Sequence, residues 1–271
     1  MSQKVRLDIH LTNKGLIDSR QKAQRIILAG KVKDKNGKVL DKPGQKVSVD
    51  LDLEVISEPK FVSRGGDKLA EAFNRFPINV ENRVCIDAGI STGGFSDCLL
   101  QKGAELIYGI DVGYGQTAWN IRNNPKVKLY ERTNIRYLDF EYLYSSNSKV
   151  ASFVAVDLSF ISLKLVLNPI LTLLDQKFWE GIFLIKPQFE VGREKVSKGG
   201  VVRDASDHIE VIESLCQFFT KNKCLINGLT ASPLKGPAGN HEYLIWLSNE
   251  KKVDLSVDSE YINLLVRNIL N

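Results

Sequence analysis

The sequence predicts an α/β fold with a mostly parallel sheet covered by helices on both faces, preceded by a small basic α+β module. Short apolar runs typical of buried strands alternate with helical patterns along the larger part of the chain. Polar residues recur where those runs begin or end, which is where side chains face the crevice of an open α/β sheet. The excess positive charge is confined to the first sixty residues.

The first sixty residues predict two helices followed by short strands. Ser19 is expected to cap a helix over 20–29, and Gly30 to end it. Asn36-Gly37 predicts a hairpin over residues 31–40 because this pair favours a tight turn. Residues 47–55 alternate with period two, as a half-buried strand does.

The charge of this module suggests a partner. Residues 1–60 hold thirteen Lys and Arg against eight Asp and Glu, and the remaining residues hold 24 of each. A basic module attached to a neutral body is the electrostatic footprint of a protein that binds a polyanion. The alternative is a solvated, lysine-rich surface without such a partner.

The remaining chain reads as alternating strands and helices. Strands are expected at 84–89, 105–113, 127–131, 150–157, 181–187, 223–230 and 241–247, and helices at 93–102, 162–175, 205–220 and 256–270. The domains are expected at 1–59 and 64–271, with a linker at 60–63.

Composition excludes several classes of protein. The four cysteines show no CxxC spacing, so we expect buried reduced thiols and no metal site. The N-terminus lacks the apolar core of a signal peptide. The longest apolar stretch, 150–174, is interrupted by Asp157 and Lys164 and is a poor membrane span. We therefore expect a cytoplasmic protein with no membrane partner.

The segment IDAGISTGGFSDCLL predicts a cofactor site. It reads as a strand, a glycine turn and a helix whose free N–H groups can meet an anion. Asp87 ends the first strand, and Asp111 ends the next, where a carboxylate can hold a ribose diol. This arrangement suits S-adenosylmethionine. A nicotinamide or flavin site is the alternative, disfavoured because GxGxxG is missing. Alone, each acid would be an ordinary turn residue.

Four separated polar residues suggest catalysis. Asp157 and Lys186 follow apolar runs, Glu242 begins one, and Lys68 opens a helical pattern. Two lysines and two carboxylates converging at a sheet edge would form a proton-transfer and charge-holding site. Each residue alone would more often be a surface side chain or part of a surface ion pair.

Residues 7–47, from LDIHLTNKGLIDSRQKAQRIILAGKV to KPGQKV, resemble the RNA-binding domain named after ribosomal protein S-four. The apolar, glycine and basic positions agree together. The resemblance implies RNA contacts by basic residues of this region and of the start of the next domain, namely Arg6, Arg20, Lys22, Arg25, Lys31 and Arg64. The alternative is a basic two-helix module without an RNA partner.

The body resembles the FtsJ-type methyltransferase domain, with a Rossmann-like sheet that binds S-adenosylmethionine. The whole chain resembles the TlyA, or hemolysin A, family through segments such as SRGGDKL, YGIDVGYGQ, ERTNIR, VAVDLSFISL, LIKPQFE and GNHEYL. The resemblance implies 2′-O-methylation of ribosomal RNA, on cytidine, with Lys68, Asp157, Lys186 and Glu242 as the catalytic tetrad. It implies cofactor contacts by Asp87, Gly89, Ser91, Gly93, Gly94, Phe95, Asp111 and Asn134.

The expected mechanism follows from the poor nucleophilicity of a ribose hydroxyl. Lys186 is expected to take its proton, and Lys68 to act as a cationic neighbour that positions RNA. Asp157 is expected to orient Lys186, and Glu242 to anchor Lys68 or the hydroxyl. The alternatives are a membrane-active hemolysin, which the missing span and signal peptide disfavour, and a non-catalytic ribosome-assembly factor, which would need no intact tetrad.

Overall fold

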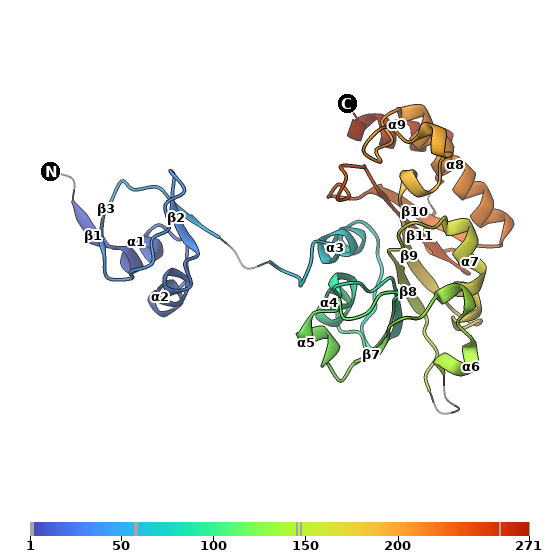
Figure 1. Cartoon of the computed structure of the whole chain (residues 1–271), viewed down its shortest axis with the longest axis horizontal. Helices are drawn as coiled ribbons and strands as arrows, with labels where there is room; N and C mark the ends of the chain where they lie inside the picture. Colours follow the sequence, from blue (N-terminus) through green and yellow to red (C-terminus); the bar gives the residue numbers. More distant parts are fainter. Residues whose placement is uncertain (1–2, 57–58, 145, 147, 255, 271) are drawn as a thin grey trace. The chain divides into compact units, whose positions relative to one another are not determined.

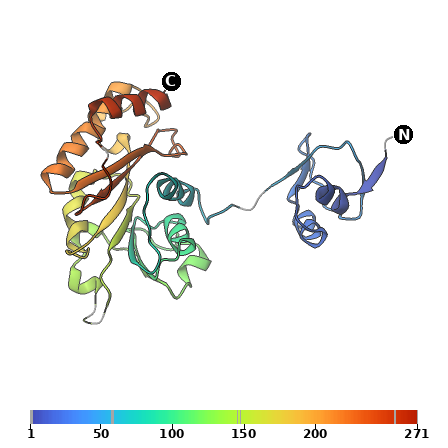
Figure 2. The same cartoon turned by 180° about the vertical axis from the view of Figure 1, so that it is seen from behind.

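The computed structural model describes residues 3–56, 59–144, 146, 148–254 and 256–270. The chain divides into two compact units, residues 1–59 and residues 60–271 (Figures 1 and 2). Phe61 is buried within the core of the larger unit. The expected boundaries of the two domains and of the linker at 60–63 remain predictions.

The small unit is an α+β fold with its own core. Helices α1 (Leu7–Asn13) and α2 (Arg20–Leu28) pack together over two antiparallel strand pairs. In one pair β1 (Lys4–Arg6) joins β3 (Lys46–Ser48), and in the other β2 (Val32–Asp34) joins β4 (Leu53–Val55). Its buried apolar residues are Leu7, Leu11, Ile17, Ala23, Ile27, Val32, Leu40 and Val47.

The local signals of the small unit are largely confirmed. The Ser19 hydroxyl accepts a hydrogen bond from Lys22 N at 3.3 Å, and Gly30 follows the helix with a positive φ of 69°. The Asn36-Gly37 turn forms, with an antiparallel bridge between Lys33 and Val39, and residues 32–34 also pair with β4. The single strand expected at 47–55 was wrong. The chain turns at residues 49–50, and its halves join different sheets.

The large unit is built on a mixed sheet, and the predicted fold class is confirmed. Within the described residues seven strands lie in the order β10-β11-β9-β8-β5-β6-β7. Only β11 runs antiparallel to its neighbours. The strands are β5 (Val84–Ala88), β6 (Leu106–Ile110), β7 (Val127–Tyr130), β8 (Phe153–Val156), β9 (Glu180–Ile185), β10 (Leu225–Ala231) and β11 (Tyr243–Ser248).

Helices cover both faces of this sheet (Figure 1). On one face lie α3 (Gly65–Arg75), α4 (Gly94–Gln101) and α5 (Trp119–Arg122), and on the other α7 (Leu163–Thr172), α8 (Ala205–Lys221) and α9 (Ser259–Leu270). Each face has its own hydrophobic core. Because successive strand residues point to opposite faces, Cys85 belongs to the core beneath α3, α4 and α5, and Ile86 to the core beneath α7, α8 and α9. Short helices α6 (Phe140–Leu143), η1 (Ile135–Tyr137), η2 (Pro187–Phe189) and η3 (Arg193–Lys195) lie in the connections.

The strand order places a switch point between β5 and β8. From β5 the chain winds outward to β6 and β7, and then returns to β8 on the other side. At such a point the loops that leave neighbouring strands diverge and open a crevice at their carboxyl ends. The residues that follow β5, β6, β8 and β9 therefore meet at one edge.

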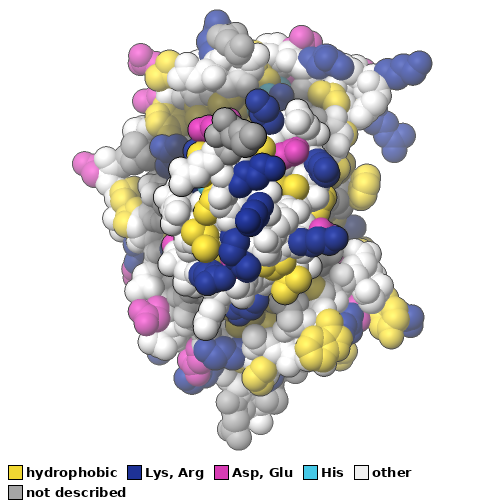
Figure 3. All heavy atoms as spheres, turned by 90° about the vertical axis from the view of Figure 1, so that its left-hand side faces the viewer, with side chains coloured by type: hydrophobic (Ala, Val, Ile, Leu, Met, Phe, Trp, Pro, Cys, Tyr) yellow, Lys and Arg dark blue, Asp and Glu magenta, His cyan; other side chains and the backbone are white. Residues whose placement is uncertain are grey.

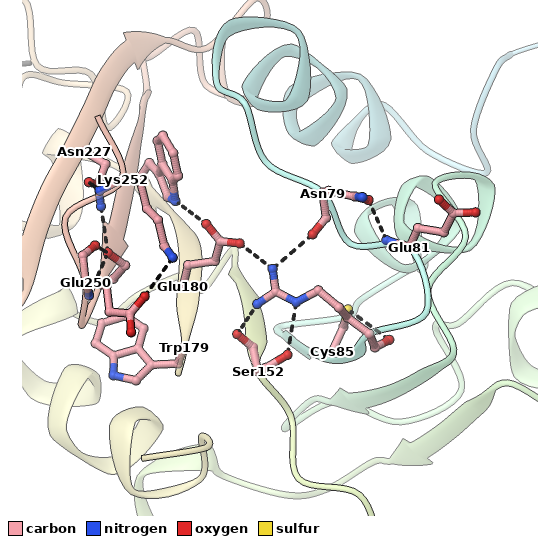
Figure 4. A network of polar contacts seen from close by, with 12 residues as sticks. Asn79, Glu81, Cys85, Ser152, Trp179, Glu180, Asn227, Glu250 and Lys252 are labelled. Carbon is pink, nitrogen blue, oxygen red and sulfur yellow. Dashed lines mark hydrogen bonds and ion pairs between the residues drawn. The ribbon is translucent and has the colours of Figure 1, made fainter. Parts of the chain in front are cut away.

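A buried polar network holds the opposite edge of the sheet (Figure 4). Arg83, just before β5, forms an ion pair with Glu180 and donates hydrogen bonds to the hydroxyl and the carbonyl of Ser152. The second oxygen of Glu180 accepts from the Trp246 indole at 2.9 Å. Four strands are therefore tied together away from the crevice.

Candidate active site

The turn after β5 is formed by glycines that leave no room for a side chain. A Cβ on Gly89 would lie 2.4 Å from the carbonyl oxygen of Asp157, and Gly89 has a φ of 91°. Gly93 has a φ of 95° and begins α4 beside Ile121. A Cβ on Gly94 would lie 2.3 Å from the Ser63 hydroxyl. The loop is therefore packed against the residue that follows β8 and against the segment that precedes α3.

Asp87 lies beneath this loop and is fully buried. Ser96 donates to its Oδ2 at 2.6 Å, whereas Oδ1 has no hydrogen-bond partner among the described residues. Burial raises the pKa of the Asp87 carboxyl to about 7, since the Ser96 bond offsets only part of the desolvation. An orphaned buried carboxylate oxygen next to the glycine turn fits a site that receives a cationic group.

Asp111 fixes the loop from the next strand. Its Oδ2 accepts from Ser91 N at 2.8 Å, and its Oδ1 accepts from Gly113 N at 2.7 Å. Each carboxylate oxygen has a second lone pair, which can accept a hydroxyl hydrogen. Asn134 lines the same pocket, where its side chain caps η1 by accepting from Arg136 N.

The four candidate catalytic residues form two ion pairs. Lys68 Nζ lies 2.5 Å from Glu242 Oε2, and Lys186 Nζ lies 2.5 Å from Asp157 Oδ1. Lys68, Lys186 and Glu242 are buried, and Asp157 is half-buried. Buried charges are retained only when they are paired, so each lysine is held by its carboxylate.

The local sequence explains how these charges reach the crevice. Asp157 and Lys186 directly follow β8 and β9. Glu242 directly precedes the antiparallel β11, so it reaches the same edge from the opposite direction. Gly236 makes room for it, because a Cβ there would lie 2.5 Å from Glu242 Oε1. Lys68 lies in the first turns of α3.

Two pockets lie along this edge and share Gly89, Ser91 and Asp157. One extends past Asp111 and Asn134, and the other past Lys68 and Arg64. Gly94 and Phe95 line the Lys68 pocket. Among the described residues, Asp87 and Gly93 line neither pocket, and they belong to the support of the glycine loop. A donor in one pocket and an acceptor in the other would meet beside Asp157.

Some lining residues escaped sequence reasoning. The Ser159 hydroxyl accepts a hydrogen bond from Lys186 Nζ at 2.9 Å, and Phe160 is 91% exposed with a positive φ of 64°. Lys235 and Pro237 line the Lys68 pocket. The sequence offered one signal for these residues, namely that they lie in the VDLSF and SPLKGP segments. The spacing of residues in a loop does not reveal which side chains line a pocket.

The expected RNA-binding residues of the small unit lie at or near its surface. Arg20, Lys22 and Arg25 are exposed, and Arg6 and Lys31 are half-buried. Figure 3 shows Lys and Arg side chains gathered on the face of the small unit that is turned toward the viewer. Arg64 belongs to the larger unit and is exposed at the Lys68 pocket.

Residues 61–249 match the FtsJ-like methyltransferase model, and residues 5–53 match the S4 domain. The chain belongs to the FtsJ-like methyltransferase family. This methyltransferase is 44% identical to the "Putative rRNA methyltransferase YqxC" of Bacillus subtilis, over 91% of this chain and 86% of that protein. It is 42% identical to the "16S/23S rRNA (cytidine-2'-O)-methyltransferase TlyA" of Mycobacterium tuberculosis, over 94% of each. The resemblance to the TlyA family is thereby confirmed.

Solved structures support the same assignment for this FtsJ-like methyltransferase. A "Putative hemolysin from Streptococcus thermophilus" matches with a TM-score of 0.72 and 36% identity, covering 99% of this chain and 96% of that one. A putative hemolysin from Lactococcus lactis matches with a TM-score of 0.72 and 38% identity, covering 79% of this chain and 100% of that one. Within the described residues, no helix is both long and apolar enough to cross a membrane.

Proposed function

We propose that this enzyme transfers a methyl group from S-adenosylmethionine to the ribose 2′-hydroxyl of cytidine in ribosomal RNA. The observation that carries the proposal is the cleft in which Asp157 lines both pockets, Lys68 lines one of them, and Lys186 contacts Asp157 at 2.5 Å. Relatives named as cytidine-2′-O-methyltransferases, such as that of Mycobacterium tuberculosis, support the acceptor.

The donor is proposed to lie in the pocket past Asp111. Asp111 would accept from the ribose hydroxyls, and Asn134 would contact the adenosine end. The amino-acid end would meet the glycine turn, where Asp87 Oδ1 lacks a partner among the described residues and α4 presents N–H groups. When bound, S-adenosylmethionine supplies a methyl carbon made electrophilic by its sulfonium.

The tetrad is proposed to act as two pairs with different tasks. Lys186, in its neutral amine form, takes the proton that the 2′-hydroxyl loses as its oxygen bonds to the methyl carbon and the methyl–sulfur bond breaks. Asp157 orients the Lys186 amine across their 2.5 Å contact. Glu242 holds Lys68 in the acceptor pocket, where its charge positions the RNA. Holding both reactants in line can supply up to about 7–11 kcal/mol of the barrier reduction.

The small unit is proposed to bind the ribosomal RNA through its basic surface. It carries the excess charge of the chain and matches the S4 domain. Since phosphate contacts supply most sequence-independent affinity, this unit would hold the substrate while the larger unit does chemistry.

The test is mass mapping of ribose methylation in ribosomal RNA after incubation with this protein and S-adenosylmethionine. We expect a new 2′-O-methylcytidine with the parent and none with Lys186→Ala. Binding of ribosomal RNA without methylation by the parent would favour the non-catalytic assembly factor. Methylation at a base atom would overturn the proposed acceptor.

A further inference from the structure

A buried carboxylate organises two arginines of the small unit. Asp8, in the first turn of α1, is fully buried. Its Oδ1 accepts from Arg6 Nε at 3.0 Å, and its Oδ2 accepts from Arg6 Nη2 at 3.0 Å and Arg20 Nε at 2.9 Å. Gln24 Nε2 donates to Oδ2 at 2.8 Å, and Ile9 N donates to Oδ1. One negative charge therefore faces two guanidinium groups.

The arginines keep most of their donors for another ligand. A guanidinium has five N–H groups in a rigid fork. Within the described residues, the bonds to Asp8 use two of these groups on Arg6 and one on Arg20. The two side chains remain 42% and 52% exposed. Both forks are thus fixed on their inner side and open on their outer side.

The arrangement is permanent at physiological pH. Hydrogen bonds from Arg6, Gln24 and Arg20, together with the charge of Arg20, hold the pKa of the Asp8 carboxyl well below its usual range, although burial opposes them. The carboxylate is therefore ionised at neutral pH. Since one carboxylate faces two guanidiniums, the cluster retains a net charge of about +1.

We propose that Asp8 is a positioning residue that presents Arg6 and Arg20 as a preorganised pair for the backbone phosphates of RNA. The inference rests on the proposed function, in which the small unit binds ribosomal RNA. Two arginines fixed before binding lose less side-chain entropy when they engage a phosphate. A guanidinium fork also matches phosphate geometry, which a lysine cannot do.

The proposal predicts that Asp8→Asn changes RNA affinity in the direction opposite to the one expected from the change in net charge alone. Asp8→Asn removes a negative charge, so electrostatics alone would tighten RNA binding. Loss of preorganisation should instead weaken it. Asp18→Asn is the matched control, because it makes the same charge change at an exposed carboxylate that pairs with Lys22 at 2.9 Å.

The experiment measures binding of the full-length protein to purified ribosomal subunits over a range of salt concentrations. We expect Asp8→Asn to bind about tenfold more weakly, the scale of one lost charge-assisted hydrogen bond. The slope of log K against log salt should also fall in magnitude by about one to two, because phosphate contacts are lost. Asp18→Asn should bind as tightly as the parent or more tightly. Binding of S-adenosylmethionine should be unchanged in both variants.

Equal or tighter binding by Asp8→Asn overturns the inference if Arg6→Ala and Arg20→Ala still weaken binding. If neither arginine variant weakens binding, the proposed RNA contacts fail as well. Should circular dichroism show that Asp8→Asn unfolds the small unit, Arg6→Lys decides. It keeps the charge but cannot make the two-point contact with Asp8. Parent-like affinity and salt slope in that variant would overturn the inference, whereas a larger loss of affinity than in Arg25→Lys, an exposed arginine of the same unit, supports it if folding is intact.

Discussion

Lys186 and Asp157 meet at 2.5 Å from neighbouring parallel strands, each one residue past the strand's carboxyl end. The register of β8 and β9 therefore sets the distance between ammonium and carboxylate. The Lys186 amine is fixed by Asp157 and by the Ser159 hydroxyl, and Asp157 itself lines both pockets. The pair is preorganised for a proton transfer at a single place.

Lys186→Ala should lower methyl transfer about 10²–10⁴-fold, the usual cost of losing a general base. Lys186→Arg should fail to a similar degree, because a guanidinium stays protonated and cannot accept the proton. Transfer of radiolabelled methyl to ribosomal subunits measures both. Lys149→Ala is the control, since this exposed lysine pairs with Glu105 away from the cleft.

Near-parent turnover of Lys186→Arg would identify residue 186 as a fixed positive charge. Catalysis would then rest on electrostatic stabilisation by the two lysines, with Asp157 or solvent taking the proton. Circular dichroism and RNA affinity of the same variants separate this result from a folding defect.

The parent should bind S-adenosylmethionine with a Kd of about 1–100 μM. Asp111→Ala should weaken binding, because it removes a ribose acceptor and releases the Ser91 and Gly113 amides. Isothermal titration measures both constants. Glu131→Gln is the control, since Glu131 also accepts a loop amide, from Gly115, but is not among the residues of the donor pocket. Unchanged affinity of Asp111→Ala would remove Asp111 from the proposed cofactor site.

The position of the site at one edge of the sheet could be predicted from the sequence, but the pairing of its side chains could not. Strand ends are visible as apolar runs that stop at a polar residue, so Asp157 and Lys186 could be placed at one edge. The partner of Lys68 lies 174 residues away in sequence, and no local pattern encodes such a pairing. The resemblance supplied the tetrad, whose catalytic roles remain predictions.

The errors have a common physical origin. Residues 47–55 alternate correctly for a strand, but period-two patterning does not reveal a turn at residues 49–50. The left-handed backbone of Phe160 is equally invisible in the sequence, because a bulky side chain gives no local signal for a positive φ.

Removing residues 1–59 should leave cofactor affinity unchanged and sharply reduce RNA affinity. The larger unit has its own two cores, so the truncated protein should fold. RNA binding by the full chain should be strongly salt-dependent, whereas the truncated protein should show a shallow slope. A truncated protein with parent-like RNA affinity would assign RNA binding to the larger unit.

Asp87→Asn should stabilise the protein relative to the parent as pH rises. The folded-state pKa of Asp87 is raised to about 7 from 3.8, so its contribution is most favourable below pH 4 and declines as pH rises through 7. The difference in unfolding free energy should reach at most about 4 kcal/mol. Denaturant titrations of both proteins at pH 5 and pH 8 measure it. Parallel pH profiles would contradict the shift.

Arg83→Ala should destabilise the larger unit by about 3–5 kcal/mol, because it leaves the buried Glu180 carboxylate without its cation. Chemical denaturation measures the loss. Arg75→Ala breaks an exposed ion pair with Glu71 and should cost less than about 1 kcal/mol. Equal losses in the two variants would mean that the network in Figure 4 adds nothing beyond a surface contact.

The separate cores of the two units have a kinetic consequence. Both belong to one chain, so once the smaller unit has captured a ribosomal RNA, docking of the larger one becomes intramolecular. Tethering of this kind raises the effective concentration to about the millimolar range for a short connection. If the smaller unit binds ribosomal RNA as proposed, the cleft of the larger unit can hold its target nucleotide weakly and release it quickly after each turnover, and the smaller unit would set the residence time on the ribosome.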